Sequence, residues 1–296
     1  MTISPLSRRK FLHLTSATAL AGWLARDAAA ATTPAPWTIG CLNRPWVKWS
    51  ADEMLDGLRA AGYTTIGLQT TTSKDKWVSN NSRDYLSALK EKIARRGLNA
   101  FQGRLTTKDG VPFDTSTAEI RQQIDNAKFL GLSCLINTGT AKPEFYENWY
   151  RMMAYAARYG ADAGVQLITK PHGGVIADAA ALRKCLEKVN HPNLGLWYDA
   201  GNVIFYTGKD PLAELEPIIG HVIAFTAKDC AGKGVNVMTQ FGTGTVDFVA
   251  IFKRLKKAGF KGPIIVESCA IGATADETTK NATANRKFLE AALAKI

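Results

Sequence analysis

Histidine is scarce in this chain, and its scarcity excludes one class of site. The sequence holds four His in 296 residues, and His13 lies in the N-terminal segment discussed below. A nuclease with several zinc ions needs a larger cluster of imidazole ligands than the remaining His can supply. His191 precedes Pro192 in a connector and His221 begins a predicted strand, so we take His172 as the candidate ligand.

Cysteine pairs and early glycine-rich loops are also missing. The five Cys are nowhere spaced as C-x-x-C, which excludes zinc-ribbon and redox motifs of that type. No G-x-G-x-x-G follows the first predicted strand, although a dinucleotide-binding open sheet needs one at that point. Gly242-Thr243-Gly244 lies late in the chain in a long loop, where a lone G-x-G is weak support for a phosphate site.

The chain also lacks long runs of one charge. Lys and Arg total 37 and Asp and Glu 26, giving a net charge of +11. Residues 1–31 hold four of the basic residues and one acidic residue, so the charge falls to +8 without them. Beyond residue 31 no basic run exceeds two residues and none is interleaved with aromatics. We interpret these charges as solvated helix faces and expect no nucleic-acid partner.

The first residues have the pattern of an export signal. Ser7-Arg8-Arg9-Lys10-Phe11-Leu12 is a twin-arginine signature, residues 14–24 are moderately apolar, and alanines at 28–31 offer a cleavage site. The apolar stretch is too short for a permanent membrane span. We therefore expect 1–31 to be a twin-arginine signal peptide and 32–296 a single barrel domain. The mature protein should be periplasmic or secreted, with no stable membrane insertion.

From residue 37 onward, short apolar runs alternate with helical patterns. Ser50 with Glu53, and Ser116 with Glu119, read as capping boxes that open helices. The predicted strands cover residues 37–41, 64–69, 98–104, 134–137, 166–170, 194–198, 222–228 and 263–267. These are eight strand–helix units, which predict an α/β protein of the (β/α)₈ TIM-barrel class. A doubly wound open sheet is the alternative.

Polar residues stand where the predicted strands end. They are Gln69, Gln102, Arg104, Asn137, Lys170, His172, Asp199, Asn202, Lys228, Asp229 and Glu267. In a parallel barrel these strand ends meet at one face, where active sites are built. Ending apolar strands in polar residues is costly unless those residues contact one another or a ligand.

His172, Asp199 and Glu267 form the nearest set of metal-ligand types. One imidazole with two carboxylates suits a divalent metal such as Mn²⁺, Co²⁺ or Zn²⁺. The alternative is a rim in which Lys170 and Lys228 neutralise the carboxylates and no metal binds. Residue alternation places Lys170 and His172 on one strand face if the extended geometry continues.

These motifs resemble those of the sugar phosphate isomerase/epimerase group, the xylose isomerase-like barrels. The resemblance covers nearly all of residues 37–294. It is carried by Arg44-Pro45-Trp46, Lys170-Pro171-His172-Gly173-Gly174, Asp199-Ala200-Gly201-Asn202, Lys228-Asp229, Gly242-Thr243-Gly244 and the approach to Glu267.

The resemblance implies a divalent metal held by Glu, Asp, His and Glu after strands five to eight. Asp199 and Glu267 match that pattern. Lys170 stands in place of the first Glu, and strand seven offers Thr226 and Lys228 in place of His. Without a metal, the chain is expected to use lysine chemistry or to be a non-catalytic sugar-binding barrel.

The leading hypothesis is an exported enzyme that removes a proton α to a carbonyl on a non-phosphorylated sugar or keto-glycoside. Isomerisation, epimerisation and elimination all begin in this way. We take Lys170, Lys228 and Glu267 as the catalytic candidates, with Lys170 or Glu267 as the base, because burial can lower the pKa of a lysine enough for this role. Arg44, Trp46, Gln69 and Asn202 are the expected substrate-binding residues, with Trp46 either stacking on a sugar or packing in the core.

Overall fold

Eight parallel strands close into a barrel in the computed structural model, which describes residues 37–72 and 81–296. The predicted signal peptide, residues 1–31, lies outside the described residues. The strands are β1 (Ile39–Leu42), β2 (Thr65–Gly67), β3 (Asn99–Arg104), β4 (Cys134–Ile136), β5 (Gln166–Thr169), β6 (Leu194–Tyr198), β7 (Val222–Ala227) and β8 (Ile264–Val266). β1 pairs with both β2 and β8, which closes the ring, so the barrel prediction is confirmed and the open sheet is excluded.

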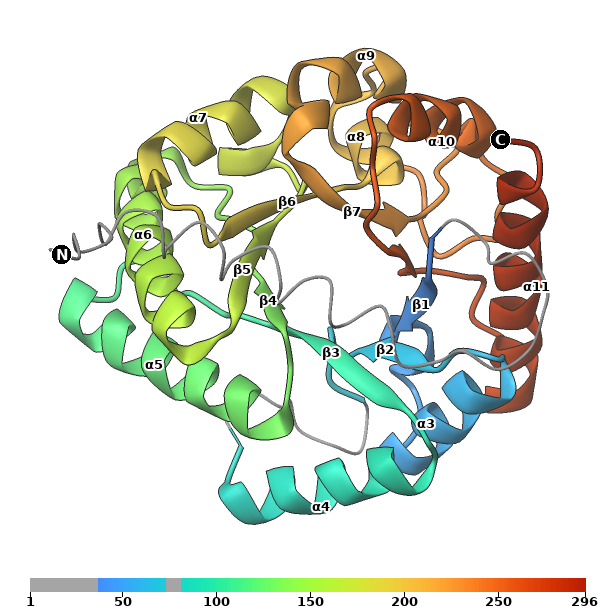
Figure 1. Ribbon diagram of the computed structural model, residues 1–296, viewed down its shortest axis with the longest axis horizontal. Coiled ribbons are helices and arrows are strands. Elements are labelled where there is room, and N and C mark those ends of the chain that lie inside the picture. Colours follow the sequence, from blue (N-terminus) through green and yellow to red (C-terminus); the bar gives the residue numbers. More distant parts are fainter. Residues whose placement is uncertain (1–36, 73–80) are drawn as a thin grey trace, which may run out of the picture. The chain divides into compact units, whose positions relative to one another are not determined.

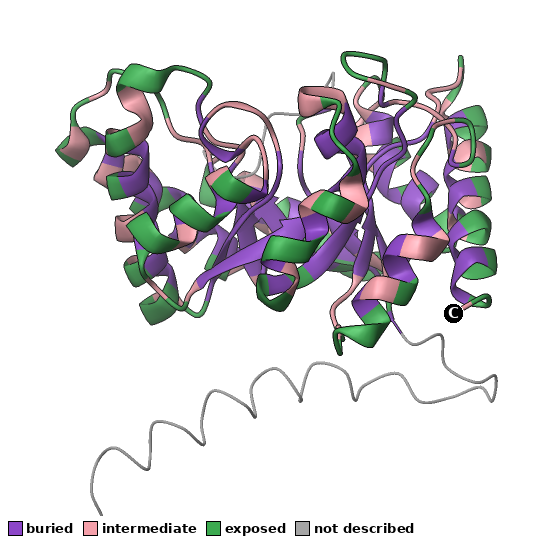
Figure 2. Cartoon of the chain, turned by 90° about the horizontal axis from the view of Figure 1, so that it is seen from above, coloured by how far each residue is buried: buried purple, intermediate pink, exposed green. Residues whose placement is uncertain are grey.

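Helices surround the barrel on the outside (Figure 1). They are α3 (Ala51–Ala60), α4 (Arg83–Arg95), α5 (Phe113–Leu130), α6 (Tyr146–Ala163), α7 (Ala179–Val189), α8 (Ala200–Thr207), α9 (Pro211–Leu215), α10 (Phe248–Lys257) and α11 (Ala275–Leu293). Their barrel-facing sides are buried and their outer sides exposed (Figure 2). None of these helices is long and apolar enough to cross a membrane.

Two of the three hydrophobic clusters in the described residues pack against the sheet, one on each side of it. The larger cluster lies between the strands and the helices. The smaller one fills the barrel interior with Leu42, Phe101, Cys134, Ile136, Ile168, Trp197, Ala224 and Ile265. Phe101 and Trp197 stack there with ring centroids 5.9 Å apart. The interior is therefore a packed core, and polar chemistry is confined to the strand ends above it.

The helix starts test the two predicted capping boxes. Ser50 caps α3, with its side chain accepting from Glu53 N–H while the Glu53 carboxylate accepts from Ser50 N–H, so this box is confirmed. The second box is wrong, because α5 begins three residues before Ser116, after Pro112. Pro112 is the N-cap residue of α5, with a ψ of 144° that lies outside helical geometry, so the helix begins at Phe113.

A short helix that the sequence pattern did not predict, α8, follows β6. Its N-cap is Asp199, whose Oδ1 accepts from Asn202 N–H at 2.9 Å. Gly201 makes this placement possible, because a Cβ at this position would lie 2.7 Å from the carbonyl oxygen of Lys228. The first turn of α8 therefore packs directly against the end of β7, and it brings Asp199 and Asn202 up to Lys228.

Candidate active site

Four buried charged residues meet at the carboxyl ends of neighbouring strands. Lys170, Asp199, Lys228 and Glu267 each follow the last residue of β5, β6, β7 and β8. Their side chains are at most 5% exposed. We call these four residues the charged cluster.

Each lysine of the charged cluster contacts both carboxylates. Lys170 Nζ donates to Asp199 Oδ2 at 2.6 Å and also to Glu267 Oε2. Lys228 Nζ donates to Glu267 Oε1 at 2.9 Å and lies 3.3 Å from Asp199 Oδ2. Each carboxylate therefore contacts both ammonium groups, a pairing that a buried charge requires.

Two further residues complete the surroundings of the cluster. Arg44, in the 3₁₀ turn η1 (Arg44–Trp46), reaches Glu267 Oε1 with Nη1 at 3.0 Å and keeps 30% of its side chain exposed. Asn202 accepts from Lys228 Nζ at 2.7 Å and donates to the carbonyl of Pro171 at 2.7 Å. Arg44 thus stands at the solvent edge, whereas the buried Asn202 holds Lys228 and the β5 loop in place.

The surroundings shift the pKa values of Lys170 and Lys228 in opposite directions. Burial lowers the pKa of Lys228 from its ordinary value, and the nearby carboxylates only partly offset this effect. Burial also opposes the charge on Lys170, but Asp199 and Glu267 outweigh it and raise its pKa. Burial favours the neutral acid at Glu267, yet Lys170, Lys228 and Arg44 hold its pKa well below the usual range. Burial thus favours the neutral amine at Lys228, whereas the two carboxylates favour the ammonium form at Lys170.

His172 turns toward Tyr206 of α8. The Tyr206 hydroxyl lies 3.2 Å from His172 Nδ1 and 3.3 Å from Nε2. Gly173, with a φ of +77°, permits this approach, since a Cβ there would lie 2.7 Å from Tyr206 Cδ1. Burial, followed by the charges of Lys170 and Lys228, lowers the pKa of His172 to about 4, so the imidazole is neutral at pH 7.

A divalent cation does not fit this donor set. Asp199 Oδ2 and Glu267 Oε2, two oxygens that would ligate it, both accept from Lys170 Nζ. Lys228 contacts the same carboxylates, so a dication would meet strong repulsion at close range. In residues 37–72 and 81–296, no group of three or more His, Cys, Asp and Glu is placed to hold a metal. The lysine ammonium groups occupy the carboxylates of the predicted Mn²⁺, Co²⁺ or Zn²⁺ site of His172, Asp199 and Glu267, so this donor set does not fit a dication.

Trp46 is not available to a sugar. Its side chain is 0% exposed, and its indole N–H donates to Thr279 of α11 at 3.3 Å. The substrate-stacking expectation for Trp46 is therefore wrong, and the packing alternative holds. Gln69 is buried and accepts from Gln102 Nε2 at 2.7 Å, which forms an amide pair above β2 and β3.

Asp229 faces away from the charged cluster, as residue alternation after Lys228 predicts. Its carboxylate accepts backbone N–H groups from Cys230, Gly242, Gly244 and Val246 at 2.8–3.2 Å. These bonds compensate its charge and tie down the loop between β7 and α10. Asp229 is a structural anchor for that loop.

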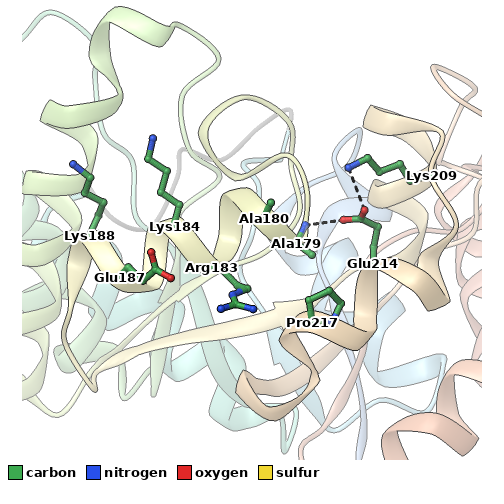
Figure 3. A pocket seen from close by; sticks show the side chains of 9 residues that line it. All are labelled: Ala179, Ala180, Arg183, Lys184, Glu187, Lys188, Lys209, Glu214 and Pro217. Atoms are coloured by element: carbon green, nitrogen blue, oxygen red, sulfur yellow. Dashed lines mark hydrogen bonds and ion pairs between the residues drawn. The ribbon is translucent and has the colours of Figure 1, made fainter.

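A groove of about 740 Å³ lies elsewhere, on the outer surface between α7 and α9. It is lined by residues such as Ala179, Arg183, Lys184 and Glu214 (Figure 3). Glu214 already accepts from Ala179 N–H at 2.7 Å and pairs with Lys209 at 3.1 Å. The groove is outside the barrel and separate from the charged cluster.

A closed parallel barrel with its charged side chains gathered at the carboxyl ends of the strands defines a protein of the TIM-barrel class. Residues 55–292 match the family described as xylose isomerase-like TIM barrel, and the chain belongs to that family.

The chain is similar in sequence to a known epimerase and in fold to several solved structures. L-ribulose-5-phosphate 3-epimerase of Escherichia coli is 34% identical over 107 residues, which is 36% of this chain and 36% of that protein. D-psicose 3-epimerase of Clostridium cellulolyticum H10, solved with D-tagatose, superposes with a TM-score of 0.71 at 13% identity, covering 86% of this chain and 99% of that one. A xylose isomerase-like barrel protein of Mycobacterium smegmatis, solved with magnesium, gives 0.67 at 16% identity and covers 87% and 97%. The structural likenesses support the fold.

Proposed function

We propose that the protein is a sugar isomerase or epimerase that moves a proton on a carbon α to a carbonyl. The observation that carries this proposal is the buried cluster in which Lys170 and Lys228 share the same two carboxylates at the barrel's catalytic face. Their pKa values are shifted in opposite directions, which agrees with different proton-transfer roles. Paired groups whose surroundings separate their pKa values are suited to acid and base roles in one reaction.

In the proposed reaction, Lys228 acts as a neutral amine and takes the proton from the α carbon. The C–H electron pair forms a carbon–carbon double bond, and the carbonyl π electrons move to oxygen to give an enediolate. The Lys170 ammonium donates a hydrogen bond to that oxygen, where negative charge develops. If the hydroxyl proton on the α-carbon's oxygen moves to the enediolate oxygen and the proton returns to the neighbouring carbon, the product is an isomer. If a second acid protonates the α carbon on its opposite face, the carbonyl re-forms and the product is an epimer.

The relatives support this reaction class, because two of the proteins similar to this chain are named as sugar 3-epimerases. The aligned curated relative is matched over only 36% of its own length, so its substrate is not carried over. Elimination from a keto-glycoside would begin with the same proton transfer.

Exchange of substrate hydrogen with solvent tests the proposal even when the product has not been identified. The protein would be incubated in D₂O with a panel of ketoses, aldoses and keto-glycosides, and loss of the α C–H signal followed by proton NMR. We expect exchange with at least one sugar, unchanged by chelator, because no step uses a metal. The exposed Lys184→Gln variant on α7 is the matched control and should exchange at the wild-type rate. Sugar binding without exchange would favour a non-catalytic sugar-binding barrel.

We also propose that the protein acts outside the cytoplasm. The support is the twin-arginine signature at Arg8-Arg9 with the apolar run and alanine-rich stretch that follow it. Export favours an unphosphorylated sugar as substrate. Cell fractionation should find the protein in the periplasm or medium, and Arg8→Lys with Arg9→Lys should keep it in the cytoplasm. Cytoplasmic wild-type protein would refute export.

A further inference from the structure

The strand ends carry more positive than negative charge. Arg44, Lys170 and Lys228 are joined by Arg104, the last residue of β3, whose charge acts on Glu267 and Arg44. In the described part of the chain, Asp199 and Glu267 are the carboxylates that form ion pairs with Arg44, Lys170 and Lys228. Asp229 does not offset the excess, because backbone N–H groups already compensate its carboxylate.

Arg104 is the basic group left without an anion. Its Nη2 donates to Thr138 Oγ1 at 3.3 Å, and its buried Nε has no hydrogen-bond partner. No ion pair joins Arg104 to a carboxylate in the part of the chain that the structure describes. A half-buried guanidinium with an unsatisfied N–H is costly unless a ligand completes it.

The barrel order separates this guanidinium from the proposed chemistry. Arg44 follows β1 and Arg104 ends β3, whereas the lysines follow β5 and β7. Between the two arginines, β2 ends at the neutral amide pair of Gln69 and Gln102. In the eight-stranded ring, Arg104 at the end of β3 therefore lies opposite Lys228 after β7, whereas Arg44 reaches Glu267 of the charged cluster. A sugar bound between Arg104 and Lys228 presents opposite ends to these two side chains.

We propose that the substrate is a sugar that carries an oxyanionic substituent, and that Arg104, assisted by Arg44, binds this substituent while the lysines act on the other end. The planar fork of a guanidinium matches a carboxylate or a phosphate. A carboxylate, as in a uronic acid, agrees with the proposed export, and a phosphate ester is the other source of the same chemistry. This inference rests on the proposed function only for the role of the lysines.

Binding measured apart from turnover tests the inference. Isothermal titration calorimetry would compare D-glucuronate, D-galacturonate and D-glucose 6-phosphate with D-glucose and D-galactose. At least one acidic sugar should bind about tenfold or more tightly than its neutral counterpart, and Arg104→Gln should remove most of that preference. Arg104→Lys, which keeps the charge, should keep part of it. Preference for the uronates or for the phosphate ester identifies the source of the anion.

The control is Arg158→Gln on the exposed outer face of α6, which should leave every affinity unchanged. Thermal unfolding of each variant shows whether a loss of binding reflects a loss of folding. Equal affinity for acidic and neutral sugars, or a preference that Arg104→Gln leaves intact, would overturn the inference. Hydrogen exchange on neutral sugars alone would leave the proposed function standing, whereas tight uronate binding without exchange on any sugar would leave only the anion site.

Discussion

Replacing Glu267 with Ala should lower the free energy of unfolding by about 3–5 kcal/mol, the cost of removing one partner from a buried ion cluster. Glu267 contacts Lys170, Lys228 and Arg44, and its side chain is 5% exposed. Its removal leaves two buried ammonium groups with Asp199 as their carboxylate partner. Urea denaturation at pH 7 measures the loss.

A matched surface change separates this effect from the general cost of removing a glutamate. Glu147 pairs with Lys188 at 3.0 Å, but its side chain is 69% exposed, so Glu147→Ala should cost less than about 1 kcal/mol. Adding Lys170→Met to Glu267→Ala should recover part of the larger loss, because it removes an uncompensated charge. If the Glu267→Ala and Glu147→Ala proteins have equal free energies of unfolding, the buried ion pairs of Glu267 do not stabilise the fold.

The stability that Glu267 provides should also depend on pH. Its pKa in the folded protein lies well below the ordinary value of 4.5. The stabilisation is therefore complete above about pH 4.5 and declines as acidification approaches the folded-state pKa, where the unfolded chain binds more protons. His172 acts in the same direction, because its pKa of about 4 in the fold lies below the ordinary value of 6.5.

The barrel could be predicted because its signals are local. Each strand is a short apolar run, and each predicted strand overlaps an observed one. Helix ends also carry local signals, as at Ser82, the N-cap of α4, and Gly131, the left-handed C-cap of α5. The start of α5 was missed because the sequence Ser116–Glu119 has a capping-box pattern while Pro112 sets the actual boundary.

The site was predicted less completely, because its contacts join residues far apart in the chain. Parallel topology implied that Lys170, Asp199, Lys228 and Glu267 would approach one another. It left open whether a metal would bind the two carboxylates or Lys170 and Lys228 would neutralise them. The placement of Asp199 and Asn202 beside Lys228 depends on α8. A signal for this helix was available in the Asp199 N-cap before the apolar Val203 and Ile204.

Trp46 and Arg104 both show that the sequence does not reveal which residues a side chain contacts. Trp46 sits beside the mouth in sequence, yet it packs against α11, an element more than two hundred residues away. The sequence placed Arg104 at the end of a strand. Only the structure shows that its buried Nε has no hydrogen-bond partner. Local sequence patterns show where polar residues lie along the chain, whereas three-dimensional packing determines which groups they bond to.

Replacing Lys228 with Gln should slow α-hydrogen exchange by about 10²–10⁴-fold, the usual contribution of a general base. Gln has no basic nitrogen, while Lys170 and Arg44 still pair with Glu267, so the fold should persist. In the wild type, exchange should rise with pH through the pKa of Lys228, which burial places below the ordinary value of 10.5. The rate should fall only when Lys170, with its raised pKa, loses its proton.

Lys228→Arg separates the base role from a purely electrostatic one. Arginine keeps the positive charge beside Glu267, but it does not deprotonate in a protein. If Lys228 is the base, Lys228→Arg should be as slow as Lys228→Gln, and neither should retain the rising limb of the wild-type pH profile. If Lys228→Arg instead exchanges at the wild-type rate, Lys228 serves only to balance charge, and the base must be Glu267, which the same pH profile would show as a limb in the acidic range.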